Sequence, residues 1–101
     1  MNDKTDMRLF TTDERGKAYF NLDLLKKGMI IHAKDNGKNY PFDEDVKILS
    51  IKPYLMWVEY HDKNNVAIRR SIRPFQIIKQ RKFEVTVKGV VYKKDTLIKG
   101  F

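Results

Sequence analysis

The chain contains no cysteine, so disulfide bonds and thiolate metal sites are excluded and a reducing compartment is permitted. It has no glycine-rich phosphate loop, because its five glycines stand far apart. No apolar run approaches the roughly 18 residues of a membrane span, and the N-terminus lacks the basic and apolar segments of a signal peptide. We therefore expect a cytoplasmic protein that binds no membrane and carries no cofactor.

Residues suited to catalysis are scarce and isolated. His32 and His61 are the only histidines, and no H-x-x-x-H pair is present. Ser50 and Ser71 lie outside any G-x-S-x-G motif. The acidic triplet 43–45 lacks the spacing of a calcium-binding loop. We therefore expect no catalytic residue, no metal site and a non-enzymatic function.

Length and composition predict one folded domain. A chain of 101 residues suits a single core, and 42% hydrophobic residues argue against disorder even though 34% of residues are charged. We divide the domain, residues 1–101, into an N-terminal arm or hairpin (1–20), a barrel (21–79) and C-terminal strands or an arm (80–101).

The N-terminal part predicts a hairpin followed by one helical turn. Short apolar runs flank residues 13–16, whose composition favours a tight turn. Asn21 is suited to cap a helical turn that ends at Gly28. Leu22 and Leu25 are expected to pack inward from that turn.

Alternating apolar residues predict three strands, at about 29–34, 46–51 and 54–60. An Asn-Gly turn ends the first of them. Residues 40–45 read as an irregular loop, because a proline and the acidic triplet interrupt the alternation. The second strand ends or bulges near Lys52, where the following proline removes a backbone donor.

A fourth strand follows in a register chosen by matching apolar faces. Placing Tyr60 opposite Val66, and Val58 opposite Ile68, keeps all four side chains on one face of the sheet. The connection is then a three-residue loop, 62–64, whose last residue is an asparagine suited to a positive φ.

Pro74 marks the end of this fourth strand. Phe75 is expected to anchor inward, and residues 76–79 are expected to form a short strand that closes against the first strand. Alternation then resumes and predicts one or two strands around Gly89. A final docking arm is expected from Leu97, Ile98 and Phe101.

Five short strands bent at two prolines resemble an SH3-like barrel of the Tudor and KOW kind. The resemblance covers about residues 25–79 and rests on the segments 25–31, 46–49, 56–60, 66–70 and 72–78. It implies a mainly β fold, a small antiparallel barrel with a short helical turn and a C-terminal β extension. It implies no particular ligand, because the glycine spacing differs from a KOW element and the aromatic side chains do not converge as in a methyl-lysine reader.

Basic charge is concentrated in one stretch: residues 63–83 carry seven cations and no carboxylate. Residues 1–50 hold nine Lys/Arg and nine Asp/Glu, so the whole net charge of +8 lies in the second half of the chain. Charge of this kind is typical of a surface that faces a polyanion. The candidate nucleic-acid-binding residues are one stacking side chain and six cations: Trp57, Arg69, Arg70, Arg73, Lys79, Arg81 and Lys82.

The seven candidates need not form one surface. In the expected register Trp57 lies opposite Arg69 on the outer face, where the two form an exposed cation–π pair. Strand alternation sends Arg70 the other way, toward the core or a barrel end. Arg70 must therefore leave the barrel, lie beyond the edge of the core, or pair with a carboxylate such as Glu44 or Asp45.

Two functions stay open. The favoured one is a non-sequence-specific module that binds DNA or RNA through the backbone, since no recognition helix, zinc finger or RNP motif is present. The alternative is a protein-interaction or inhibitor module with no nucleic-acid role. Small basic barrels are common among proteins of mobile elements, so this alternative includes a protein encoded by such an element. It would bind another protein or a second copy of itself by strand addition, through Leu55, Trp57 and the apolar C-terminal arm.

Overall fold

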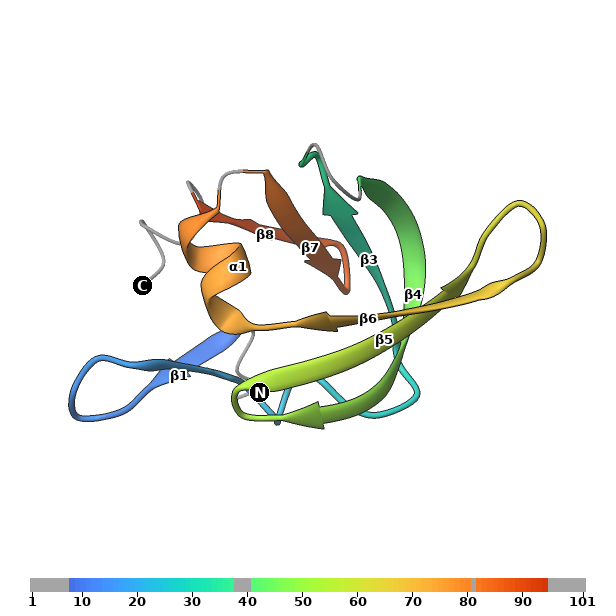
Figure 1. The fold of residues 1–101 in the computed structure, drawn as a ribbon. Coiled ribbons are helices and arrows are strands. Elements are labelled where there is room, and N and C mark those ends of the chain that lie inside the picture. The colour runs from blue at the N-terminus through green and yellow to red at the C-terminus, as the bar shows by residue number, and fades with distance from the viewer. Residues whose placement is uncertain (1–7, 38–40, 81, 95–101) are drawn as a thin grey trace.

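The computed structural model describes residues 8–37, 41–80 and 82–94 (Figure 1). These residues form eight strands and one helix: β1 (Phe10–Thr12), β2 (Ala18–Phe20), β3 (Ile30–Asp35), β4 (Phe42–Lys52), β5 (Leu55–His61), β6 (Ala67–Ile72), α1 (Pro74–Lys79), β7 (Phe83–Val87) and β8 (Val90–Lys93). β1 and β2 form a two-stranded sheet, and the other strands form one antiparallel sheet in the order β6-β5-β4-β3-β7-β8. The predicted mainly β fold is confirmed.

The predicted N-terminal hairpin is confirmed, and Asp13 closes it. The Asp13 carboxylate accepts hydrogen bonds from the backbone amides of Arg15 and Lys17, both at 2.9 Å. A further hydrogen bond, from the amide of Phe20 to the carbonyl of Pro53, ties the hairpin to the turn between β4 and β5. The hairpin is thereby fixed at one end of the large sheet, below α1 in Figure 1.

A capped turn connects the hairpin to β3. The backbone carbonyl of Asn21 accepts hydrogen bonds from the amides of Leu24 and Leu25, and its side-chain oxygen accepts the amide two residues ahead. Gly28 ends the turn at a φ of +92°, which favours glycine. Leu25 is buried as expected, but the prediction for Leu22 is wrong, because Leu22 is 39% exposed and Leu24 is buried in its place.

The loop predicted at 40–45 is wrong from Phe42 onward, where β4 begins; Tyr40 lies outside the described residues. Phe42 is buried, and the acidic residues that follow it are paired across the ladder with β3. Asp43 lies opposite Lys34 and Asp45 lies opposite His32. These cross-strand partners offset the repulsion between carboxylates on which the loop prediction rested.

β4 ends at Lys52, as the following proline predicts. Its pairing with β5 shifts between Ile48 and Ser50, which is a β-bulge that the alternation did not reveal. A bulge bends a strand, and Figure 1 shows β4 curving along its length.

The register predicted between the third and fourth strands is wrong by two residues. Tyr60 pairs with Ile68 rather than Val66, and Val58 pairs with Arg70. A shift of two residues keeps every side chain on the face it was assigned, so matching faces cannot distinguish these two registers.

The β5–β6 loop decides the register, and it is longer than predicted. Asp62 accepts hydrogen bonds through its side chain from the amides of Asn64 and Val66, at 2.8 and 2.9 Å. Asn65, not Asn64, takes the positive φ, at 63°. An aspartate that accepts two amides ahead of it stabilises a wider turn than a three-residue loop allows.

Residues 76–79 are helical, so the strand predicted there is wrong. Pro74 is the first residue of α1, a position where its fixed φ and missing amide hydrogen are favourable. The Gln76 side chain reaches back and accepts the amide of Arg73 at 2.7 Å. Burial of Pro74 and Ile77 follows helical spacing rather than strand alternation.

The closed barrel is also wrong. The strand that pairs with β3 is β7, with Ala33 opposite Val85, and β6 and β8 lie at opposite edges of the sheet. Phe75 does not anchor inward, because it is 50% exposed on the outer side of α1. β7 and β8 confirm the strands predicted around Gly89, whereas Leu97, Ile98 and Phe101 lie outside the described residues.

One hydrophobic core joins the hairpin, the inner face of the large sheet and α1. The largest fully buried side chains come from these three parts and from the capped turn before β3: Phe10, Phe20, Phe83, Leu9, Leu24, Leu25, Ile48, Met56, Ile72, Ile77, Val46 and Val58. Because the hairpin shares this core, its position relative to α1 is fixed by packing, and that position defines the cleft described below.

Candidate functional site

The sequence-predicted centre of the binding surface lies on the outer face of the large sheet. Trp57 is 42% exposed there, but its cross-strand partners are Ser50 and Ser71 rather than Arg69. Arg69 lies opposite Glu59, and its Nε donates to the Glu59 carboxylate at 2.9 Å. The predicted cation–π pair is therefore wrong, and Arg69 forms an ion pair instead.

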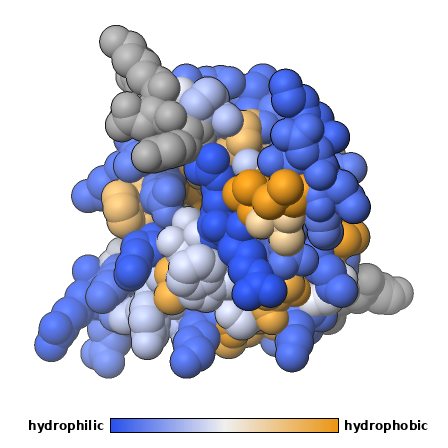
Figure 2. Space-filling view, turned by 45° about the vertical axis from the view of Figure 1, so that its right-hand side comes forward, coloured by the Kyte–Doolittle hydropathy of each residue, from blue (hydrophilic) through white to orange (hydrophobic). Residues whose placement is uncertain are grey.

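Charges on this outer face alternate in sign from strand to strand. Glu59 lies between Arg69 on β6 and Lys47 on β4. A second row runs across four strands and places Asp43, Lys34, Glu84 and Lys93 in consecutive register positions. Opposite charges in adjacent positions reduce the field that a polyanion meets. Figure 2, which shows one side of the molecule, presents a mostly hydrophilic surface with apolar side chains in small separate patches.

His32 belongs to the same face and lies between two carboxylates. Its ring nitrogens contact Asp45, at 2.8 Å, and Asp43. Hydrogen bonds to Asp45 and then Asp43 raise the pKa of His32 above its ordinary value, against a smaller opposing effect of burial. No group of three metal-ligating side chains suited to a metal ion is present among residues 8–37, 41–80 and 82–94.

Arg70 points to the opposite face of the sheet. Its guanidinium carbon lies 4.4 Å from the centroid of the Phe42 ring, and that ring stacks in turn on Tyr60 with a centroid separation of 5.4 Å. Arg70 is only partly exposed, and its contact with an aromatic ring gives it a structural role. Arg69 and Arg70, adjacent in the sequence, therefore do not share a binding surface.

Arg81 and Lys82 are the last two of the candidate residues in the sequence. The ammonium group of Lys82 lies close to Gly37 in the β3–β4 turn. A Cβ atom at this glycine would be 2.9 Å from both Lys82 Nζ and the Asp35 carboxylate. The Lys82 carbonyl accepts the amide of Asn36 at 2.9 Å, which fixes this segment beside the turn. Arg81 lies outside the described residues.

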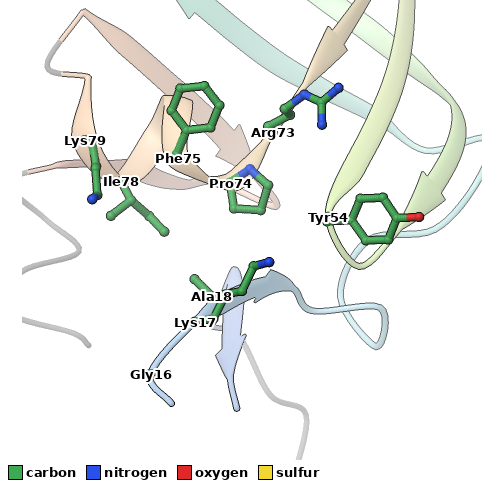
Figure 3. A pocket seen from close by; sticks show the side chains of 9 residues that line it. All are labelled: Gly16, Lys17, Ala18, Tyr54, Arg73, Pro74, Phe75, Ile78 and Lys79. Atoms are coloured by element: carbon green, nitrogen blue, oxygen red, sulfur yellow. The ribbon is translucent and has the colours of Figure 1, made fainter. Parts of the chain in front are cut away.

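Arg73 and Lys79 are the two candidates that the fold brings together. Arg73 immediately precedes α1 and Lys79 is its last residue, and both line a cleft of about 560 Å³ between this helix, the hairpin and the β4–β5 turn (Figure 3). Its lining residues are Gly16, Lys17, Ala18, Tyr54, Arg73, Pro74, Phe75, Ile78 and Lys79. Three of these are cations and none is a carboxylate.

Lys17 is the third cation of the cleft and the one most engaged with its own hairpin. Its Nζ lies 5.7 Å from the centroid of the Tyr19 ring. The hydrogen bond from the Lys17 amide is the main cause of a lowered pKa at Asp13, and the Lys17 charge acts in the same direction. Arg73 and Lys79, in contrast, form no ion pair with any carboxylate of the described residues.

Two aromatic rings complete the cleft, and sequence reasoning missed both. Phe75 and Tyr54 are 50% and 53% exposed, and Figure 3 shows them on either side of Pro74. The error on Phe75 came from extending strand alternation past Pro74. A proline at the first position of a short helix would have placed Pro74 and Ile77 inward and Phe75 outward.

Comparison with known proteins returns no matching family model, no matching curated protein and no matching solved structure. Within the described part of the chain, no helix has the length and apolar character needed to cross a membrane.

Proposed function

We propose that this chain is a non-enzymatic nucleic-acid-binding module, and that its cleft contacts the phosphate backbone without reading the base sequence. The observation that carries the proposal is the composition of the cleft, where Lys17, Arg73 and Lys79 gather with no acidic lining residue. Cations that neutralise phosphates release condensed counterions from a nucleic acid, and two of these three, Arg73 and Lys79, form no ion pair with a carboxylate of the described residues.

This proposal moves the binding surface away from Trp57 and Arg69. Glu59 already neutralises Arg69, and Arg70, partly buried, stacks on Phe42 on the opposite face of the sheet. The basic stretch of the sequence therefore contributes Arg73 and Lys79 to the cleft, and the hairpin contributes Lys17, which lies outside that stretch.

We also propose that the large sheet and α1 contain an open SH3-like module. β3 to β6 form a meander, α1 follows, and β7 returns to pair with the first strand of the meander. This arrangement supports the resemblance to SH3-like modules, in an open form to which the hairpin and β8 are additions. The resemblance concerns the fold and carries no ligand with it.

A protein-interaction module is the second candidate, and the edge of the sheet favours it. β6 pairs with β5 alone among the described strands, so its other side offers backbone groups for strand addition. A dimer that forms at micromolar concentration and persists at high salt, measured by light scattering during gel filtration, would support this role.

The test of nucleic-acid binding is fluorescence anisotropy with labelled DNA and RNA oligonucleotides at low salt and at about 200 mM salt. We expect binding in the micromolar range that weakens steeply with salt and is unchanged when the base sequence is scrambled. Unchanged anisotropy of every probe at low salt, with tens of micromolar protein, would exclude the proposal.

A further inference from the structure

The cleft carries more apolar surface than phosphate binding requires. Residues 8–37, 41–80 and 82–94 contain three aromatic side chains that are strongly exposed, Tyr54, Trp57 and Phe75, and two of them line this one cleft. Phe75 is half exposed, and leaving its apolar surface in water costs the free protein about 25 cal/mol for each exposed Å². A ligand that covers Phe75 would remove that cost.

We infer that the cleft binds unpaired nucleotides, with a base stacked on Phe75 or Tyr54 while Arg73 and Lys79 contact the flanking phosphates. This inference rests on the proposed function and specifies its substrate: single-stranded rather than double-stranded nucleic acid. Cationic grooves with exposed aromatic rings are the arrangement by which proteins hold single strands without sequence preference.

The geometry of the cleft fits this ligand. Phe75 projects from α1 between Arg73 and Lys79 in the sequence, so a ring and two cations lie along one short segment (Figure 3). Tyr54 lines the cleft from the β4–β5 turn and adds a second ring with a hydroxyl group, which Figure 3 shows pointing away from Phe75. The volume of about 560 Å³ lies within the range of pockets that enclose small organic groups.

Base pairing would prevent this contact. In a duplex, each base has both faces covered by its stacked neighbours, so a protein ring can reach a base face only when the strand is unpaired or the base is extruded at an energetic cost. Phosphate contacts, by comparison, are available in either form. Base pairing should therefore prevent stacking on the aromatic rings of the cleft but leave the phosphate contacts of its cations in place.

The experiment compares three fluorescent probes of equal total phosphate number on the wild-type protein: a pyrimidine single strand, a duplex of half its length that contains a pyrimidine strand, and a single strand of abasic residues. We expect the pyrimidine strand to bind at least about fivefold more tightly than either of the others, since a stacked base contributes a factor of about five or more. This comparison requires no protein variant.

Phe75→Leu provides the second measurement, with Trp57→Leu as its matched control. Both substitutions remove one exposed ring, but only Phe75 lies in the cleft. Phe75→Leu should weaken the pyrimidine strand by about fivefold or more and leave the duplex and abasic probes unchanged, whereas Trp57→Leu should change none of the three.

The possible outcomes separate the two proposals. Equal affinity for all three probes, unaffected by Phe75→Leu, would overturn the inference and leave backbone binding intact. Binding of none of them would overturn the proposed function itself. Equally tight binding of a glutamate peptide with the same number of charges would also overturn the inference, because the cleft would then recognise negative charge alone.

Discussion

Arg69 on the outer face and Arg73 on the cleft lie four residues apart in the sequence but have opposite electrostatic surroundings. Arg69 donates to Glu59, and Glu59 also faces Lys47 on the next strand. Arg73 lines the cleft together with two lysines and an exposed phenylalanine, and no carboxylate is among the lining residues. The number of cations in a stretch of sequence thus says less about binding than the sign of their neighbours in space.

The strongest test of this comparison removes two cations from each region. The double variant Arg73→Gln/Lys79→Gln should weaken oligonucleotide binding by about tenfold and reduce the salt dependence of log K by about 1.4, as expected for two lost phosphate contacts on a single strand. Anisotropy titrations at several salt concentrations measure both quantities.

The control for this prediction is Arg69→Gln/Lys47→Gln, which changes net charge equally on the outer face. It should alter affinity by less than about twofold, because Glu59 is ion-paired with Arg69 and lies opposite Lys47, so the outer face attracts phosphate only weakly. If the two double variants lose affinity equally, net charge and not the cleft governs binding, and the comparison fails.

Arg70 sharpens the comparison because the basic stretch includes it while the fold turns it, partly buried, onto the Phe42 ring. Arg70→Ala should lower the free energy of unfolding by about 1 kcal/mol, through loss of the contact with Phe42 and of the packing of its aliphatic chain. Urea denaturation measures the change in stability. Oligonucleotide affinity should stay within about twofold of wild type; a large loss of affinity with no loss of stability would return Arg70 to the binding surface.

Glu59 should keep the cations of the outer face from binding nucleic acid. Glu59→Gln leaves Arg69 and Lys47 without their shared carboxylate and should raise oligonucleotide affinity by about twofold at low salt, an effect that disappears as salt screens the surface. Asp23→Asn, in the exposed turn before β3, changes net charge equally and serves as the control. A similar gain from both variants would show a non-local charge effect.

The smallest expected effect concerns His32 and pH. The pKa of His32 is raised in the folded state, so its stabilising contribution is fully present below the unfolded pKa of about 6.5 and is lost as pH rises through the folded value. His32→Gln should therefore lower the melting temperature more at pH 5.5 than at pH 8.5. Exposed ion pairs contribute about 0.2–1 kcal/mol, so the difference should be a few degrees at most; an equal effect at both pH values would contradict it.

Local sequence signals predicted most of the strands. Alternation located β3, β5 and β7, and the turn residues located the β1–β2 hairpin and the end of β4. Each signal acts over a few residues, because strand alternation and turn conformations depend on side-chain direction and backbone preferences near the site. The errors arose where partners distant in sequence decide the outcome.

Phe42 and Phe75 illustrate those errors. Phe42 extends β4 because its ring is buried against Tyr60 and Phe83, so burial overrides the acidic residues beside it. Phe75 faces water because Pro74 begins a helix whose other side packs into the core. The burial of Phe42 depends on partners distant in sequence. Pro74 is a local signal for the helix that turns Phe75 outward, but the hairpin that completes the cleft lies far from Phe75 in the sequence.

By itself, the sequence determined an antiparallel β protein with an uncompensated basic stretch, since alternation and charge are properties of the residues in order. Only the tertiary structure decided which cations meet carboxylates and which do not. Strand register placed Glu59 against Arg69, and packing of the hairpin below α1 gathered Lys17, Arg73 and Lys79 around two exposed rings. Electrostatic interactions depend on distances in space, and those distances follow from register and packing.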